Sequence, residues 1–455
     1  MRTCTSRLLA AAVTAALAAT ATAVTVGPAA AATAGAAATA APRSAAASDP
    51  FYAYDGSTPL ASLTPGTVLK TRTLPYHVLG LPTPVTAVQL LYRTTDAQGR
   101  PSANVTTVVR SLTGDGGKAV SYQSFYDSLD PGDGPSRAVA GDLSLGGAIP
   151  NIEAVFLVPL LAQGYNVVIP DTEGQNADFA AGPEYATNTL DSIRAATRSP
   201  ATGMGPDTRF GLMGYSGGAV ATGWAAALAP GYAPEVNAKL VGYTVGGLLV
   251  DPAHNLGYVD GSLAWSGIIP LSVIGVSRSL GIDLMPYLND YGRSLYQRLE
   301  HGSIVDALGH YPGLTWKAMA KPQYADPNSV PPFVDAINRN NLGSAPTPTV
   351  PGAMAQGNGG FLEGTFAGPA GIGTGDGVMV AGDVRALARQ YCATGTSPVS
   401  YQQYDLLSHF GVPVVWAPQA LAWLDDRFAG RPAPSDCGHI PPGNPLTPQQ
   451  PTPTH

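Results

Sequence analysis

Residues 210–223, "FGLMGYSGGAVATG", place one serine among small and apolar neighbours. Within this stretch, residues 214–218 fit the pattern G-x-S-x-G around Ser216. That pattern is typical of a sharp turn between a strand and a helix, which exposes a nucleophilic serine hydroxyl. The chain has 54 glycines, so the same frame also fits an ordinary glycine-rich turn. The rest of the sequence has to decide between the two.

Strands alternate with helices along most of the chain. Alternating apolar runs at 87–93 and 105–110, separated by a turn, predict a β-hairpin. Further strands are predicted at 165–170, 209–213, 238–250, 351–357 and 399–404, and helices at 152–164, 185–198, 217–229, 383–392 and 417–428. This alternation predicts an α/β fold with a mostly parallel sheet flanked by helices, in one large domain over residues 49–440.

One long segment, about residues 251–346, interrupts the alternation. Its apolar residues are dense but are broken by Pro270, Gly275 and Gly281, and its strongest apolar run, 264–276, is much shorter than a membrane span. The segment fits either a helical lid over a pocket or a second packed layer. Because lids conventionally arise as such insertions, we expect an inserted helical lid.

Composition excludes several classes of protein. Only 12% of the 455 residues are charged and the formal net charge is -7, so there is no basic stripe for nucleic acid. No His/Cys/Asp cluster has the spacing of metal ligands, and no G-x-x-x-x-G-K phosphate loop occurs. We therefore expect no nucleic-acid partner, no metal and no organic cofactor.

Both ends of the chain have the composition of segments outside a folded core. Residues 1–32 combine two arginines, an uncharged Ala/Leu/Val run and small residues, which predicts a secretory signal peptide and no transmembrane anchor. Residues 33–48 are an Ala-rich tether, and residues 441–455 are rich in Pro and polar, so both are expected to be disordered. The mature protein is expected to be secreted.

Cysteine usage agrees with export. Cys4 leaves with the predicted signal peptide, so the mature protein keeps Cys392 and Cys437. Two cysteines outside the cell normally pair, and we expect a disulfide between them; two buried free thiols are the alternative. The loop closed by this bridge contains His409.

His409, in the stretch "YDLLSHFGVP", occupies the position expected of a catalytic base. A serine hydroxyl needs a base within hydrogen-bond reach, and the base needs an acid to orient it. After a G-x-S-x-G turn these follow in the order Ser, Asp or Glu, His, with the histidine between the last strand and the final helix. A loop histidine satisfied by backbone groups is the alternative.

The acid is expected after the strand at 351–357, where Glu363, Asp376 and Asp383 are available. Asp376 is preferred because it ends a glycine-rich run and precedes a turn into the next helix. Asp383 fits the N-cap of that helix better. Glu363 remains the reserve candidate, and a capping role remains open for Asp376.

The oxyanion formed during attack needs two hydrogen-bond donors. The amide of Gly217, which follows the serine, is expected to supply one. The other is expected from the loop after the strand "AVSYQ", which contains Asp127 and Ser128; the HGGG motif of many esterases is absent there. A plain surface turn is the alternative for that loop.

Together these motifs resemble the secreted lipases of the Candida antarctica lipase A type, including actinobacterial relatives. The resemblance rests on the order and spacing of "LLYRTTDAQGRP", "YDS", "VVIPDTEG", "MGYSGG", "GGLLVDP", "GDGVMVAGDVRALARQYC" and "YDLLSH". It implies an α/β-hydrolase fold with a helical lid and a triad of Ser216, Asp376 and His409. It also implies Asp127 and Gly217 at the oxyanion hole. The chain departs from the family's short "HGxxD" pattern through a glycine-rich insertion before Asp376.

The sequence thus predicts a secreted serine lipase that hydrolyses lipid esters, such as triacylglycerols, through an acyl-enzyme. A short-chain carboxylesterase or acyltransferase would use the same triad. A peptidase and a catalytically silent binding protein of the same fold are the remaining alternatives. The expected partner is a lipid or other ester substrate, met at a lipid–water interface.

Overall fold

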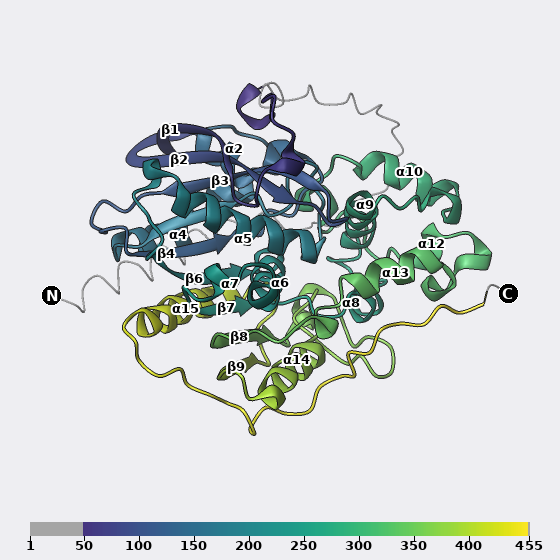
Figure 1. The fold of residues 1–455 in the computed structure, drawn as a ribbon. Helices are drawn as coiled ribbons and strands as arrows, with labels where there is room; N and C mark the ends of the chain where they lie inside the picture. Colours follow the sequence, from purple (N-terminus) through teal and green to yellow (C-terminus); the bar gives the residue numbers. More distant parts are fainter. Residues whose placement is uncertain (1–48, 454–455) are drawn as a thin grey trace.

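The computed structural model describes residues 49–453. Its strands are β1 (Val68–Val78), β2 (Leu81–Thr95), β3 (Pro101–Val109), β4 (Lys118–Gln123), β5 (Asn166–Pro170), β6 (Arg209–Tyr215), β7 (Leu240–Gly246), β8 (Gly352–Gly357) and β9 (Val399–Tyr404). They form one sheet in the order β1-β2-β3-β5-β4-β6-β7-β8-β9 (Figure 1). The predicted signal peptide and tether lie outside the described residues.

The sheet is antiparallel at one edge and parallel elsewhere. β1, β2 and β3 form an antiparallel meander that joins β5, and all pairs from β5 through β9 are parallel. The predicted hairpin is β2 and β3, joined by a short turn, whereas each parallel pair requires a longer crossover. The mostly parallel α/β sheet predicted from the sequence is confirmed.

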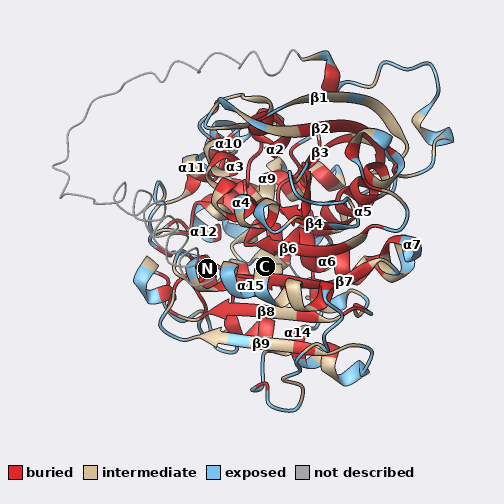
Figure 2. Ribbon diagram, turned by 90° about the vertical axis from the view of Figure 1, so that its left-hand side faces the viewer, coloured by how far each residue is buried: buried red, intermediate tan, exposed pale blue. Residues whose placement is uncertain are grey.

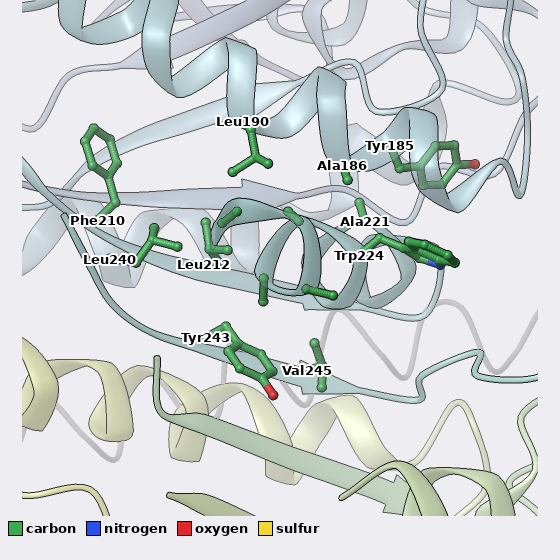
Figure 3. Close-up of a cluster of buried hydrophobic side chains, with 14 of the residues drawn as sticks. Tyr185, Ala186, Leu190, Phe210, Leu212, Ala221, Trp224, Leu240, Tyr243 and Val245 are labelled. Atoms are coloured by element: carbon green, nitrogen blue, oxygen red, sulfur yellow. The ribbon is translucent and has the colours of Figure 1, made fainter. Parts of the chain in front are cut away.

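Helices cover both faces of the sheet (Figure 2). One face carries α5 (Gly182–Arg198), α6 (Gly217–Tyr232), α7 (Pro234–Asn237) and α14 (Ala381–Thr394), and the other carries α2 (Pro135–Ala140), α3 (Ala148–Ile152), α4 (Ala154–Ala162) and α15 (Val412–Phe428). Successive strand residues serve the two cores in turn, because side chains alternate across a strand. On β6, Phe210 and Leu212 pack with α5 and α6 (Figure 3), whereas Met213 and Tyr215 pack with α15.

The interrupting segment is helical and lies between β7 and β8. Its helices are α8 (Pro252–Val259), α9 (Ile268–Leu280), α10 (Asp290–Leu299), α11 (Ile304–Ala307), α12 (Trp316–Met319) and α13 (Pro331–Arg339). Two of the three breakers noted in the sequence mark the ends of α9, because Pro270 lies in its first turn and Gly281 caps it in the left-handed conformation. Gly275 lies inside α9, where a Cβ would lie 2.3 Å from the Phe179 carbonyl oxygen. Two apolar clusters hold the insertion together. We refer to residues 251–346 as the lid segment.

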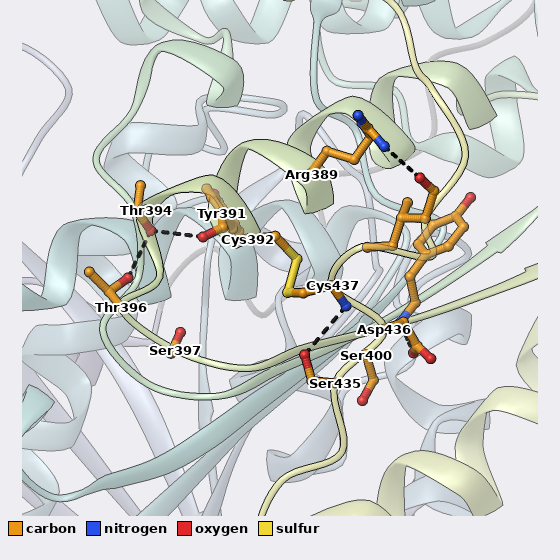
Figure 4. The surroundings of a disulfide bond; sticks show 12 residues. Arg389, Tyr391, Cys392, Thr394, Thr396, Ser397, Ser400, Ser435, Asp436 and Cys437 are labelled. Carbon is orange, nitrogen blue, oxygen red and sulfur yellow. Dashed lines mark hydrogen bonds between the residues drawn. A yellow bond between two sulfur atoms is a disulfide. The ribbon is translucent and has the colours of Figure 1, made fainter.

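Cys392 and Cys437 form a disulfide with Cα atoms 5.4 Å apart (Figure 4). Cys392 lies in the last turn of α14, and Cys437 follows α15. The bridge therefore ties the chain beyond the final helix back to the sheet's flanking helix, as the sequence predicted.

Replacing both cysteines by serine should lower the free energy of unfolding by about 2–4 kcal/mol, because the bridge spans 45 residues and restricts the unfolded chain. Urea denaturation of the variant and the parent measures this difference. Thiol counting on the unreduced, denatured parent should find that neither Cys392 nor Cys437 is free. Two reactive thiols would contradict the bridge.

The C-terminal tail differs from the disordered segment that the sequence predicted. It has no helix or strand, yet the Asn444 amide donates to the Gly382 carbonyl at 3.0 Å, and the Gln449 amide donates to Asn338 Oδ1 at 2.8 Å. Side chains and loop carbonyls of the domain thus satisfy the tail's backbone without regular structure. Composition indicated the lack of regular structure correctly but did not reveal these partners.

Candidate active site

Ser216 lies at the turn between β6 and α6 with φ of 52° and ψ of -121°, a strained conformation for a residue with a side chain. The residues two positions before and after it must be glycine. A Cβ on Gly214 would lie 2.1 Å from the Gly218 carbonyl oxygen, and one on Gly218 would lie 2.0 Å from the Gln123 carbonyl oxygen. Both outer glycines of the G-x-S-x-G pattern therefore lie too close to backbone carbonyls to carry a side chain.

The structure brings Ser216, His409 and Asp376 together. His409 Nε2 lies 2.7 Å from Ser216 Oγ, and His409 Nδ1 lies 2.8 Å from Asp376 Oδ2. An ionised carboxylate only accepts hydrogen bonds, so Nδ1 carries the proton and Nε2 is free to accept from the serine hydroxyl. This is the arrangement in which imidazole can act as a general base toward serine.

Backbone and side-chain contacts hold this arrangement on both sides of the imidazole. Asp376 Oδ1 accepts from the amides of Val378 at 3.1 Å and Met379 at 2.7 Å. The His409 amide donates to the Asp376 carbonyl at 2.7 Å, and Tyr215 Oη donates to the His409 carbonyl at 2.6 Å. Rotation of the Asp376 side chain would break its two amide contacts, and the backbone of His409 is held by the other two.

Three carboxylates influence the pKa of His409. Burial lowers that pKa, but the charges of Asp376, Glu363 and Asp127 raise it, and the net result is a pKa above the ordinary 6.5. A base of this kind is neutral only above that raised pKa. Activity that depends on neutral His409 should therefore be lost toward acidic pH.

The other two candidate acids lie away from the His409 ring nitrogens. Asp383, on the first turn of α14, has Oδ1 2.9 Å from His254 Nδ1 and accepts from Asn444 Nδ2. Glu363 accepts from the Phe410 amide instead of an imidazole nitrogen. Of the three acids that the sequence offered, the structure places Asp376 on the histidine.

Asp127 lies beside the turn of Ser216. It has a positive φ of 43°, and a Cβ on Gly217 would lie 2.0 Å from Asp127 Oδ1. Gly217 is the first residue of α6, and the first amides of a helix have no partner in a preceding turn of that helix. The loop predicted to supply the second oxyanion donor therefore does adjoin the serine, and the glycine after Ser216 permits that approach.

Two buried glutamates that the sequence analysis missed flank this loop. Glu153 accepts from the Phe125 amide at 2.9 Å, and Glu173 accepts from the Ser128 amide at 3.2 Å. Burial raises the pKa of both carboxyls, that of Glu153 to about 7. Only Glu173 left a signal, since it follows a buried strand in "VVIPDTEG", at the edge where parallel strands end.

A largely apolar cavity opens at Ser216 and runs beneath the lid segment. Its apolar walls include Val220, Leu256, Ile269, Val273, Phe333 and Ile337. These six residues come from the four helices α6, α8, α9 and α13.

Across residues 49–453, no three His, Cys, Asp or Glu side chains are grouped so as to hold a metal ion. In the same part of the chain, none of the helices combines the length and apolar character needed to cross a bilayer.

The family assignment comes from comparison with known proteins. A family model described as secretory lipase matches residues 142–361 and 370–436. The chain belongs to the secretory lipase family. As a member of that family it is a carboxylic ester hydrolase, with a fold and an enzyme class that agree with the sequence prediction.

Relatives of this secretory lipase occur in bacteria and fungi. A probable inactive lipase of Mycobacterium tuberculosis is 33% identical over 391 residues, covering 84% of this chain and 82% of that protein. Lipase 6 of Candida albicans is 31% identical over 384 residues, covering 82% and 80%. The solved closed state of Candida antarctica lipase A superimposes with a TM-score of 0.75 at 23% identity, covering 89% of this chain and 91% of that one. That likeness confirms the α/β-hydrolase fold.

Proposed function

We propose that this secretory lipase hydrolyses lipid esters through an acyl-enzyme on Ser216, with His409 as general base and acid and Asp376 as the residue that orients it. The observation that carries the proposal is the unbroken chain of contacts, 2.7 Å from serine to histidine and 2.8 Å from histidine to aspartate. All three side chains are buried, so water does not compete for these hydrogen bonds.

The reaction follows from these positions. His409 Nε2 takes the Ser216 proton as Oγ attacks the ester carbonyl, and the developing oxyanion is met by the Gly217 amide and the Asp127 loop. His409 then gives its proton to the departing alcohol, which leaves the acyl group on Ser216. A water molecule, deprotonated by the same imidazole, hydrolyses this acyl-enzyme.

The apolar cavity supports a long acyl chain as the group transferred. Hydrolysis of p-nitrophenyl esters from acetyl to palmitoyl tests this directly. Activity that persists to palmitoyl supports the lipase, and activity confined to the shortest chains favours a carboxylesterase. Because a relative is named an inactive lipase, a silent protein is the second candidate; no turnover of any ester would favour it.

Narrowing the cavity should shorten the acyl chains accepted. Val273 lies on α9 and lines the cavity. Val273→Trp should lower kcat/KM for palmitoyl esters about tenfold or more, since overfilling a packed space costs roughly 1–3 kcal/mol. It should spare acetyl esters. Val158→Trp, on the exposed side of α4, is the matched control, and equal losses on both esters would contradict an acyl-chain cavity.

Ionisation of Asp127 should make kcat fall toward alkaline pH. Burial raises the pKa of the Asp127 carboxyl to about 7. The charge of His409 lowers this pKa, and the charge of Glu153 raises it. Below that pH the carboxyl is neutral; above it, an ionised carboxylate next to the oxyanion repels the developing charge. Activity should therefore fall as pH rises through about 7.

Asp127→Asn should remove that decline, because the amide stays neutral and asparagine tolerates a positive φ. The measurement is kcat between pH 6 and 9, with the exposed Asp115→Asn as control. A variant that keeps the parent's alkaline decline would refute this role for Asp127.

Export is part of the proposal. It is supported by the composition of residues 1–32, by the disulfide and by membership of a secretory family. N-terminal sequencing of protein recovered from the culture medium of the producing cell tests it. A mature terminus near residue 33 is expected, and activity retained only inside cells would argue against export.

A further inference from the structure

Glu363 lies in the glycine-rich insertion before Asp376, part of which the family model does not match. Residues 358–375 separate β8 from Asp376 and contain one charged residue, Glu363. The family model leaves residues 362–369 unmatched, so Glu363 lies outside the matched pattern. Its neighbours Phe361 and Leu362 are exposed, whereas the Glu363 side chain turns inward. A charged group facing in while apolar groups face out requires a structural cause.

The cause is a set of hydrogen bonds from the lid segment and the histidine loop, one of them from the Ser408 side chain. Glu363 Oε1 accepts from the Phe410 amide at 2.9 Å, and Oε2 accepts from Trp265 Nε1 at 2.6 Å. Phe410 follows His409 directly, and Trp265 comes from the lid segment. One carboxylate therefore joins the insertion, the histidine loop and the lid.

Trp265 contacts both Glu363 and the His409 ring. Its ring meets the His409 ring edge-on, with centroids 5.1 Å apart, and stacks on Phe410 at 5.4 Å. Trp265 also lines the substrate cavity beside Ser216. A tryptophan held here limits where the imidazole can move and closes one side of it to water.

We propose that Glu363 is a second carboxylate, distinct from Asp376, that positions the catalytic base: it fixes Trp265 and the loop after His409 against the imidazole and places a negative charge beside it. This inference rests on the proposed role of His409. Glu363 acts through other groups and does not touch the reacting atoms, so it is a positioning residue.

Charges from every element packed around His409 shape its titration. Asp376 precedes α14, Asp127 follows β4, Glu363 ends the 3-10 turn η11 (Gly360–Glu363), and Tyr215 ends β6. Tyr215 is neutral throughout, since burial raises its pKa well above 10. Removing only the Glu363 charge should therefore lower the His409 pKa and leave the Asp376 contact in place.

Three variants separate charge from geometry. Glu363→Gln removes the charge and one acceptor, because glutamine has a single carbonyl oxygen for two N–H donors. Trp265→Phe removes one donor but keeps the charge. The double variant combines Glu363→Gln with Trp265→Phe, so the glutamine NH₂ group no longer faces an indole N–H. The negative charge is lost, but the hydrogen bond from the Phe410 amide is kept. Leu362→Ala, exposed in the same turn, is the matched control.

The first readout is the NMR titration of the His409 imidazole, which needs no substrate. Glu363→Gln and the double variant should move it to lower pH by about 0.5 unit or more. Trp265→Phe and Leu362→Ala should leave it within about 0.2 unit of the parent. The acid limb of kcat should move with the titration, and plateau kcat of Glu363→Gln should fall about 5–20-fold from misplacement of the base.

An unmoved titration in Glu363→Gln and in the double variant would overturn the proposal, even if kcat fell, because a purely structural role lowers the plateau without moving the pH profile. If Glu363→Gln does not fold, the double variant alone decides. A parent that hydrolyses no ester would count against the proposed function, and the titration would still decide whether Glu363 acts on His409.

Discussion

Ser216→Ala should lower kcat for ester hydrolysis by about 10⁴–10⁶-fold while leaving the fold intact. In the proposed mechanism the hydroxyl oxygen forms the acyl-enzyme, and its loss leaves only the oxyanion hole and binding to speed the reaction. Burst-phase kinetics and mass spectrometry after treatment with an alkyl phosphonate measure the effect, since only the parent should gain the label on the peptide that contains Ser216.

Ser192→Ala provides a matched control. Ser192 is also buried, on α5, and its hydroxyl donates to the Thr189 carbonyl at 2.8 Å, away from the triad. It should retain parental kcat. If Ser216→Ala kept esterase activity, another nucleophile would have to be sought, and the triad assignment would fail.

Asp376→Asn should lower kcat by about 10⁴-fold at pH 8. Asp376 Oδ1 accepts from the amides of Val378 and Met379, so the asparagine oxygen should stay there and its NH₂ group should face His409 Nδ1. The imidazole would then carry its proton on Nε2, where it cannot accept from Ser216. Circular dichroism should show an unchanged fold.

This variant also distinguishes the two acids that the sequence left open. Glu363→Gln should cost far less activity than Asp376→Asn, because Glu363 contacts Trp265 and the Phe410 amide instead of the imidazole nitrogens. The reverse order of losses would make Glu363 the triad acid and contradict the distances in the structure.

The G-x-S-x-G frame predicted the turn of Ser216 once the order of the other motifs supported it. Gly214 approaches the Gly218 carbonyl within the same turn, and Gly218 approaches Gln123 on the adjacent strand, so both constraints leave a glycine in one short pattern. His409 could be placed by its position between the last strand and the final helix. The disulfide followed from the cysteine count and the predicted compartment, and the structure has it.

Long-range contacts decided what the sequence could not. Asp376, Asp383 and Glu363 lie within one glycine-rich stretch, where position favoured Asp376 but left Glu363 open as the residue that reaches His409. Glu153 and Glu173 act on the 125–128 loop from 28 and 45 residues away, through buried contacts without a recognisable motif. The same holds for Trp265, which comes from the lid segment.

The sequence by itself therefore determined the α/β architecture, the turn of Ser216, the position of His409 and the bridge between Cys392 and Cys437. The sequence preferred Asp376, and only the tertiary structure showed its contact with the histidine, what holds the Asp127 loop, and how the tail packs. The physical reason is distance along the chain. Steric limits at a turn act between neighbours and leave a pattern, whereas a buried carboxylate is defined by partners that folding brings together.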